Sequence, residues 1–485
     1  MPTLQSLLAA LTTSTIGARP FSMSRICRLL SLVILTCCCP VVLFASTYYL
    51  APASEGGNDS NNGYSSGKPW LSPNHSLNCG DVIIALASTS YDSSNFNSGH
   101  WGNVSCPGNN NVAWLKCATF DGCKIYSDVE GIYVDHSYWG VQGWEVNVWG
   151  GESGFCFGAA PSYTNLVNIH HVIFANNIAN GCKGGGFVSF NVGSTGVDYF
   201  NVLGNIVYDA IQGSDECYNG ISIYQPVQAD WASGTHIYVA GNYTWDNYEA
   251  NPCGGVQAWG GDGIMFDTFD GSHGMPYVYQ AQAVAENNIS IGNGGHGIEV
   301  QNNVAGSGHA LIILSNNTVW GNEQMTYQQY NHLCAEVLLN SAYNVQERWN
   351  LVATKAQTAC AENPNYALSA YQVNSTDLVY ANLTFAYNGQ YTYFYWGTNF
   401  SYETNNVTGM NPNLADPYVP GPPSCGWAEN VANCMAWVAN DLKPTNPLAT
   451  WAGFQPPSTS PQSAPLFPTW VCNAGLPAGL TIKPC

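Results

Sequence analysis

Charged residues are scarce in this chain, and basic residues are the scarcest. Asp, Glu, Lys and Arg make up 9% of the 485 residues, against roughly 25% in an ordinary soluble domain. The 11 Lys and Arg residues stand against 31 Asp and Glu residues, which gives a net charge of −20. Binding to nucleic acid or to an anionic membrane relies on Lys and Arg paired with phosphate, so neither is an expected partner. A polyanionic glycan would also be repelled unless cations bridged it.

Several sequence signatures are absent. No CxxC pair occurs, which argues against a structural zinc site. No glycine-rich stretch ends in GK[ST], so a phosphate-binding loop is not expected. After residue 46 no segment has the apolar spacing of a helix, whereas short alternating runs broken by Gly, Asn and Asp recur. The chain is therefore expected to be all-β.

The N-terminus has the layout of a secretory signal. From Met23, two arginines precede an apolar run over residues 29–44 and then the small pair Ala45 and Ser46. The run is ~16 residues long where a membrane span needs about 20, so no transmembrane segment is expected in the mature chain. We predict a signal peptide over residues 1–46, with residues 1–22 either a long n-region or an upstream misread start. The mature protein is then secreted and extracellular.

Cysteine usage agrees with export. Four of the 18 cysteines lie in the predicted signal, and the 14 that remain are an even number, which indicates disulfide bonds. Short-range pairs are expected between Cys117 and Cys123, Cys425 and Cys434, and Cys472 and Cys485.

An asparagine set between two alternating apolar runs recurs along the chain. The spacings between copies vary from 24 to 46 residues, which fits a rung of roughly two dozen residues with loops of varying length. Such a chain buries its apolar faces by coiling and stacking rung on rung, as a solenoid does. The repeated Asn fits a turn between two strands, and copies in successive rungs could form an inward-facing ladder. The copies are Asn177, Asn205, Asn242, Asn288, Asn317, Asn350, Asn382 and Asn406.

Three stretches carry a family resemblance. The opening "YYLAPASEGGNDSNNGYSSGKPW" resembles the N-terminal module of many secreted β-helix proteins. "GDGIMFD" and "NNISIGNGGHGIEVQNN", followed by "NNTVWGN", resemble a signature common in bacterial right-handed β-helix repeat proteins. Over roughly residues 47–415 the chain thus resembles the pectate-lyase-like superfamily.

The resemblance implies a right-handed parallel β-helix over residues 47–410. It specifies the fold and leaves the reaction open, because this fold carries lyases, hydrolases, epimerases and adhesin modules. The Pro-rich residues 411–485 contain too few repeats for further rungs. We expect them to form an irregular, disulfide-tied cap over the last rung.

A second repeat, Gly followed by apolar, variable and apolar residues, brings acids into register. If the apolar residues enter the core, the residue between them faces out. At the first outward position the rungs read Tyr133, Cys156, Val188, Ser222, Met265, Glu299 and Glu336, the last in a divergent "AEVL" copy. With rungs ~4.8 Å apart, Glu299 is predicted to lie against Glu336. In the same way Asp262 is predicted to lie against His296, and Asp267 diagonal to Glu299 at roughly 7 Å.

Stacked carboxylates repel, so either one keeps a proton or a hard cation lies between them. The first solution is that of a glycoside hydrolase, in which a carboxyl separation of about 5 Å suits a retaining enzyme and ~7 to 9 Å an inverting one. The second would place Ca²⁺ on Asp262, Asp267 and Glu299, and only this solution needs a cofactor. The structural alternatives are turn caps for Asp262 and Asp270 and solvated acids for Glu299 and Glu336. The predicted catalytic residues are Asp262, Asp267, Glu299, Glu336 and His296.

The resemblance also implies a rival lyase chemistry. Pectate lyases of this fold pair Ca²⁺ with a Lys or Arg base, but no basic residue stands in the acid cluster of this sequence. Alternative bases from elsewhere in the chain would be Lys183, Arg348 or Lys355. Trp259, Tyr224 and Gln301 are predicted to bind substrate.

A monomeric enzyme that binds and cleaves polysaccharide is therefore expected. The competing hypothesis is a non-catalytic, adhesin-like surface solenoid whose acids are merely solvated.

Overall fold

The computed structural model describes most of the chain from residue 45 onward. The described ranges are 45–108, 111–150, 154–164, 166–211, 217–249, 260–303, 308–324, 334–354, 366–374, 376–386, 391–396, 402–414, 444–447, 449 and 451–453. The predicted signal peptide and most of the predicted cap lie outside them, so both stay predictions. No helix within these ranges is long and apolar enough to cross a membrane.

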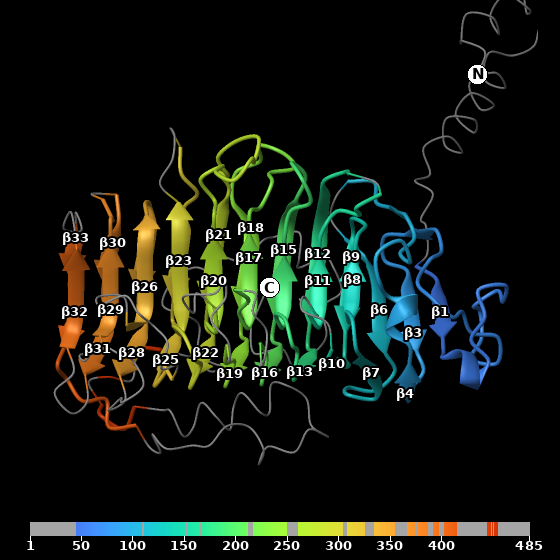
Figure 1. The fold of residues 1–485 in the computed structure, drawn as a ribbon, viewed down its shortest axis with the longest axis horizontal. Helices are drawn as coiled ribbons and strands as arrows, with labels where there is room; N and C mark the ends of the chain where they lie inside the picture. The colour runs from blue at the N-terminus through green and yellow to red at the C-terminus, as the bar shows by residue number, and fades with distance from the viewer. Residues whose placement is uncertain are drawn as a thin grey trace, which may run out of the picture. The chain divides into compact units, whose positions relative to one another are not determined.

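Three long parallel sheets make up the described chain, which is a right-handed parallel β-helix as predicted (Figure 1). Each complete turn of the coil, from β6 to β32, contributes one strand to each sheet, so neighbouring strands come from successive rungs. The twelve-stranded sheet contains β1 (Thr47–Leu50), β3 (Val82–Ala85), β6 (Ala113–Cys117), β9 (Trp139–Gln142), β12 (Ile169–Ala175), β15 (Val197–Leu203), β18 (Thr235–Ala240), β21 (Gln282–Glu286), β24 (Ile312–Ser315), β27 (Val345–Arg348), β30 (Leu378–Tyr380) and β33 (Tyr402–Thr404).

The other two long sheets complete the coil. The eleven-stranded sheet contains β4 (Ser88–Tyr91), β7 (Cys123–Ser127), β10 (Trp144–Val148), β13 (Ile178–Asn180), β16 (Ile206–Tyr208), β19 (Tyr243–Trp245), β22 (Ile289–Ile291), β25 (Thr318–Trp320), β28 (Leu351–Thr354), β31 (Leu383–Ala386) and β34 (Val407–Thr408). The nine-stranded sheet contains β8 (Ile132–Val134), β11 (Phe157–Ala159), β14 (Phe187–Ser189), β17 (Ile221–Tyr224), β20 (Ile264–Asp267), β23 (Ile298–Asn303), β26 (Ala335–Ala342), β29 (Tyr366–Tyr371) and β32 (Tyr391–Trp396).

Short elements decorate the first rungs of the coil. Strands β2 (Leu77–Asn78) and β5 (Val104–Ser105) form a small parallel sheet, and two 3-10 turns span Ala53–Glu55 and Ser93–Asn95.

The core consists of columns of apolar side chains stacked from rung to rung. Phe157 and Phe187, which pair in register, stack with ring centroids 4.7 Å apart. Each buried column repeats at every rung because parallel strands in register place like positions over one another. One such column on the nine-stranded sheet reads Ile132, Phe157, Phe187, Ile221, Ile264, Ile298, Val337 and Leu368, all buried.

All eight predicted asparagines form one ladder at the turn between the twelve- and eleven-stranded sheets, and all but Asn406 are buried. Asn242, for example, donates from its backbone N–H and its side-chain amide to Oδ1 of Asn288, at 2.9 and 3.0 Å. The left-handed residue of each turn is the one before the ladder Asn, such as Asn287 with φ of 57°. The ladder therefore satisfies buried turn amides that no strand can reach.

Disulfide bonds and the far end of the chain bear on two further predictions. Described cysteines pair as Cys79–Cys106, Cys117–Cys123 and Cys156–Cys182, of which the second was predicted. Cys425, Cys434, Cys472 and Cys485 lie outside the described residues. Within the predicted cap, Ala449 and Ala452 pack against Leu351 and Leu383.

Candidate functional site

A groove of about 500 Å³ runs along the outer face of the nine-stranded sheet. It lies over the outward columns in which the sequence placed the acids. Its described lining residues include no Lys or Arg. They are Glu130, Phe155, Tyr163, Val188, Ser189, Phe190, Asn191, Cys217, Tyr218, Asn219, Ser222, Tyr224, Met265, Asp267 and Gln301.

Asp267 places a carboxyl group in this groove. It is the last residue of β20 and pairs in register with Tyr224 on one side and Gln301 on the other. Its carboxylate accepts hydrogen bonds from Thr268 Oγ1 at 2.7 Å and from Asn302 Nδ2 at 3.4 Å. Burial raises the pKa of Asp267 to about 6, and these hydrogen bonds hold it from rising further.

Asp262 and Glu299 are buried beside residues that line the groove, and they form what we call the acid pair. Glu299 is 4% exposed and pairs in register with Met265, which lines the groove. One ligand atom from each member of the pair and from His296 lie within 4.8 Å of one another. The backbone N–H of His296 donates to Asp262 Oδ1 at 2.6 Å, so the predicted neighbourhood of these two residues is confirmed.

Burial governs protonation in the acid pair. It raises the pKa of Glu299 well above its usual value, and the negative charge of Asp262 and a side-chain hydrogen bond with it add to the rise, against the charge of His296. Burial also raises the pKa of Asp262, but the charge of His296 and its backbone N–H favour the carboxylate. Glu299 is therefore the member of the pair that holds the proton.

Glu323 is a member of the site that sequence reasoning missed. Its buried carboxylate forms an ion pair with Nδ1 of His296 and accepts a hydrogen bond from the backbone N–H of Ala335 at 3.1 Å. Burial alone would lower the pKa of His296, but the charge of Glu323 outweighs it and the pKa rises well above its usual value. A signal was present, since the rung before reads Asn293-Gly294 where this rung reads Asn322-Glu323.

Glu336 does not lie against Glu299, and this prediction is wrong. Ile298 pairs with Val337 and Glu299 with Leu338, so the "AEVL" copy is offset by two residues from the predicted alignment. The carboxylate of Glu336 instead accepts from the backbone N–H and side-chain amide of Asn322, at 2.9 and 2.8 Å. It ends a second buried ladder through Asn247, Asn293 and Asn322.

A similar offset affects the earlier rung at residue 154. Phe157 pairs with Ile132, so Gly158 and not Cys156 continues the outward column beside Tyr133. Cys156 is fully buried in its disulfide with Cys182. The "GFCF" copy was therefore aligned two residues early.

Only some of the remaining predicted residues lie in the groove. Tyr224 and Gln301 line the groove, whereas Trp259 and Lys355 lie outside the described residues. Asp270 caps a turn by accepting from the backbone N–H of Ser272 at 2.9 Å.

The two alternative lyase bases are not among the groove residues. Lys183 lies in the turn after β13, where its backbone N–H donates to Val148 O. Arg348 belongs to the twelve-stranded sheet, where it donates to Tyr380 Oη at 3.0 Å and lies over the ring of Trp349.

The predicted Ca²⁺ ligands do not fit a calcium site. Calcium takes six to eight oxygen ligands, whereas the cluster offers the acid pair and an imidazole, and Asp267 is not part of it.

No protein-family model matches this chain, and no curated protein does. Among solved structures, pectate lyase Pel9A is similar at 17% identity, over 78% of this chain and 84% of that chain, with a TM-score of 0.40. A rhamnogalacturonan lyase is similar at 14% identity, over 76% and 87%, with a TM-score of 0.34. The GH136 lacto-N-biosidase from Eubacterium ramulus is similar at 12% identity, over 80% and 71%, with a TM-score of 0.34. At such low identities the likeness concerns the fold alone.

Proposed function

We propose that this protein is a secreted glycoside hydrolase that cleaves a polysaccharide in the groove. Asp267 acts as general base and Glu299 as general acid. The observation that carries the proposal is the placement of these two residues on adjacent strands, two positions apart in register and therefore on the same face of the sheet. Their environments separate the two pKa values, with that of Asp267 at about 6 and that of Glu299 raised well above its usual value.

The two roles follow from these protonation states. Near neutral pH Asp267 is ionised and can accept a proton from water, while Glu299 still holds one to give. As the water oxygen forms a bond to the anomeric carbon, the glycosidic bond breaks and the leaving oxygen takes the proton of Glu299. Diagonal neighbours on adjacent strands lie about 7 Å apart, which leaves room for the water and predicts inversion at the anomeric carbon.

Asp262 and His296 act through Glu299 in this scheme. The negative charge of Asp262 raises the pKa of Glu299 and keeps its proton in place. His296 fixes Asp262 through its backbone N–H, and Glu323 fixes the ring of His296. Asp262 and His296 are therefore positioning residues.

The charge of the site favours a neutral glycan. Asp267 and Glu130 line the groove, and the described lining residues carry no basic side chain to bind a uronate or to serve as a lyase base. A polyanionic chain would be repelled from such a groove.

The test is incubation of the protein with plant and microbial glycans, with release of reducing ends and absorbance near 235 nm both followed. Release of reducing ends without a rise in absorbance supports hydrolysis. A rise in absorbance, which reports unsaturated products, would indicate lyase chemistry instead. No cleavage of any glycan would favour the adhesin-like solenoid.

Variants then test the assignment of residues. Asp267→Asn and Glu299→Gln should each lower kcat by about 10²- to 10⁴-fold. Glu347→Gln is the matched control for Glu299→Gln, because Glu347 is also buried but belongs to the twelve-stranded sheet. Equal losses in all three variants would point to misfolding and overturn the assignment.

A further inference from the structure

Two exposed aromatic side chains, Trp231 and Tyr277, contact one another outside the groove. Trp231 is 68% exposed and Tyr277 36%, and their ring centroids lie 5.8 Å apart. We call this pair the aromatic platform. Trp231 belongs to the loop 225–234 between β17 and β18, and Tyr277 to the loop 268–281 between β20 and β21.

The two loops are joined to each other by hydrogen bonds. Tyr277 Oη donates to the backbone oxygen of Gln228 at 2.7 Å. The backbone N–H of Gln280 donates to the Gln228 side chain at 3.1 Å. The platform is therefore built from two successive rungs that hold one another in place.

A buried carboxylate anchors both loops to the coil. Asp198 is fully buried and accepts from the backbone N–H of Ala229 at 2.7 Å and from Tyr279 Oη at 2.6 Å. The ring of His236 contacts the same carboxylate at 3.1 Å. The side chain of Asp198 thus holds both loops, the one that carries Trp231 and the one that carries Tyr277.

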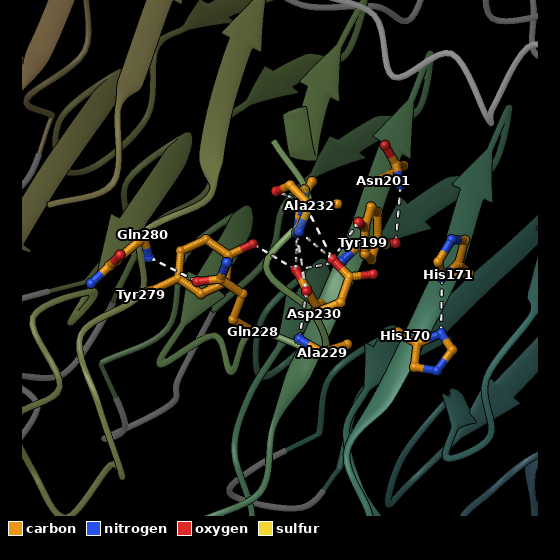
Figure 2. Close-up of polar contacts among 12 residues, drawn as sticks. His170, His171, Tyr199, Asn201, Gln228, Ala229, Asp230, Ala232, Tyr279 and Gln280 are labelled. Atoms are coloured by element: carbon orange, nitrogen blue, oxygen red, sulfur yellow. Dashed lines mark hydrogen bonds and ion pairs between the residues drawn. The ribbon is translucent and has the colours of Figure 1, made fainter. Parts of the chain in front are cut away.

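The residues on both sides of Trp231 are also fixed (Figure 2). Asp230 accepts from the Tyr199 hydroxyl and from the backbone N–H of Ala232, both at 2.9 Å. The oxygen of Ala232 contacts Nε2 of His236 at 3.1 Å. Tyr199, whose φ is 45°, stacks on His236 with ring centroids 3.9 Å apart.

Buried polar groups thus hold an exposed tryptophan in a fixed position. A surface loop with no ligand gains little from such anchoring, whereas a binding site gains affinity when its contact residues are already ordered. Backbone strain of the kind seen at Tyr199 also gathers at functional sites.

The two loops that carry the platform begin at the groove. The loop that carries Trp231 begins after Tyr224, and the loop that carries Tyr277 begins after Asp267, and both of these strand-end residues line the groove.

We infer that the aromatic platform is a sugar-binding subsite that stacks a neutral saccharide ring of the bound polysaccharide. Flat aromatic faces suit the apolar face of a sugar, and the exposed carboxylate of Asp230 can accept from its hydroxyl groups. The same carboxylate disfavours a uronate at this position. The inference rests on the proposed function for the identity of the occupant, but the platform can bind sugar whether or not the groove cleaves it.

The test compares Trp231→Ala with Trp149→Ala in the full chain carrying Asp267→Asn, so that the polymer stays intact. Trp149 is the matched control, because it is also 68% exposed but follows β10 of the eleven-stranded sheet. Binding is measured by affinity electrophoresis and calorimetry on laminarin, xylan and galactomannan, with polygalacturonate as the acidic polymer. Trp231→Ala should weaken binding of a neutral polymer about five- to tenfold and Trp149→Ala should not.

Further variants separate stacking from anchoring. Tyr277→Phe keeps the ring and should bind more tightly than Tyr277→Ala. In the active enzyme, Trp231→Ala should raise KM for the polymer, whereas Trp149→Ala should not.

The outcomes distinguish the two proposals. Cleavage of a neutral polymer with equal affinity in Trp231→Ala and Trp149→Ala overturns the subsite and leaves the hydrolase standing. Binding that depends on Trp231, without any cleavage by the wild type, overturns the hydrolase and leaves the subsite. Failure of the protein to bind any neutral polymer overturns the subsite, as would tighter binding of polygalacturonate.

Discussion

The carboxylate of Glu336 accepts two hydrogen bonds from Asn322 in the interior of the coil, and it does not face Glu299 across a rung. Glu336 therefore ends the second buried ladder, the one that passes through Asn322. We expect Glu336→Gln to keep wild-type kcat, because the amide oxygen can accept the same two hydrogen bonds. A loss of kcat as large as that of Asp267→Asn, measured on the same glycan, would show that Glu336 takes part in catalysis.

The same variant should change how stability depends on pH. Burial raises the pKa of Glu336 from 4.5 to about 8, so the unfolded chain releases this proton at a lower pH than the folded protein does. The wild type therefore loses stability as pH rises from about 4.5 to 8, by an amount on the order of a few kcal/mol. Glu336→Gln should flatten this part of the profile, measured by thermal unfolding at a series of pH values.

The pH dependence of cleavage should report Asp267. Hydrolysis requires its carboxylate, and burial raises its pKa to about 6. We expect kcat/KM to fall tenfold for each pH unit below this value. A profile that stays flat from pH 7 to pH 4.5 would exclude Asp267 as the base.

Glu347 offers a prediction of stabilisation. It is fully buried, neither carboxyl oxygen has a hydrogen-bond partner among the described residues, and burial raises its pKa to about 8. Glu347→Leu should raise the free energy of unfolding by about 1–3 kcal/mol. The gain should grow as pH rises from about 4.5 to 8, because only the wild type must retain a proton there. Chemical denaturation at pH 5 and pH 8 measures both numbers, and a destabilised variant would show that the carboxyl is satisfied in solution.

Loss of one ladder asparagine should cost more in the middle than at the end. Asn288 accepts from Asn242 and donates to Asn317 and to the oxygen of Val239. We expect Asn288→Ala to lower the free energy of unfolding by about 2–4 kcal/mol, because buried backbone and amide groups lose their partners. Asn406→Ala, at the last described position of the ladder, should cost less than half as much by the same measurement.

Removal of calcium should leave hydrolysis unchanged. The acid pair and His296 supply one nitrogen and two carboxylates, and Asp267 stands apart from them. Dialysis against EDTA, followed by assay with and without added Ca²⁺, tests this expectation. Activity that disappears and returns with Ca²⁺ would show that ligands beyond this cluster complete a calcium site.

The fold could be predicted because it repeats. Each ladder Asn marks the same turn of the coil, so eight weak signals along the chain reinforced one another and all eight joined one ladder. The neighbourhood of Asp262 and His296 followed from the same periodicity, because "GDGI" and "GHGI" align without a gap.

The site was predicted only in part, because register is fixed in space and not in the sequence motif. A Gly was taken as the start of each strand, but the rungs at residues 154 and 335 begin elsewhere, which displaced Cys156 and Glu336. Glu323 escaped notice because it approaches His296 from a turn and not from the aligned strands. The platform residues belong to loops, to which no repeat pattern applies.

Parallel pairing between successive rungs also determines how this chain must assemble. Every partner in the long sheets is at least a full turn away along the chain, so no strand can form its pairs before a second turn has been laid down. Folding dominated by such distant contacts is slow, and each unfinished coil presents an open strand edge to other molecules. A protein truncated between rungs would therefore be expected to aggregate more readily than the complete chain.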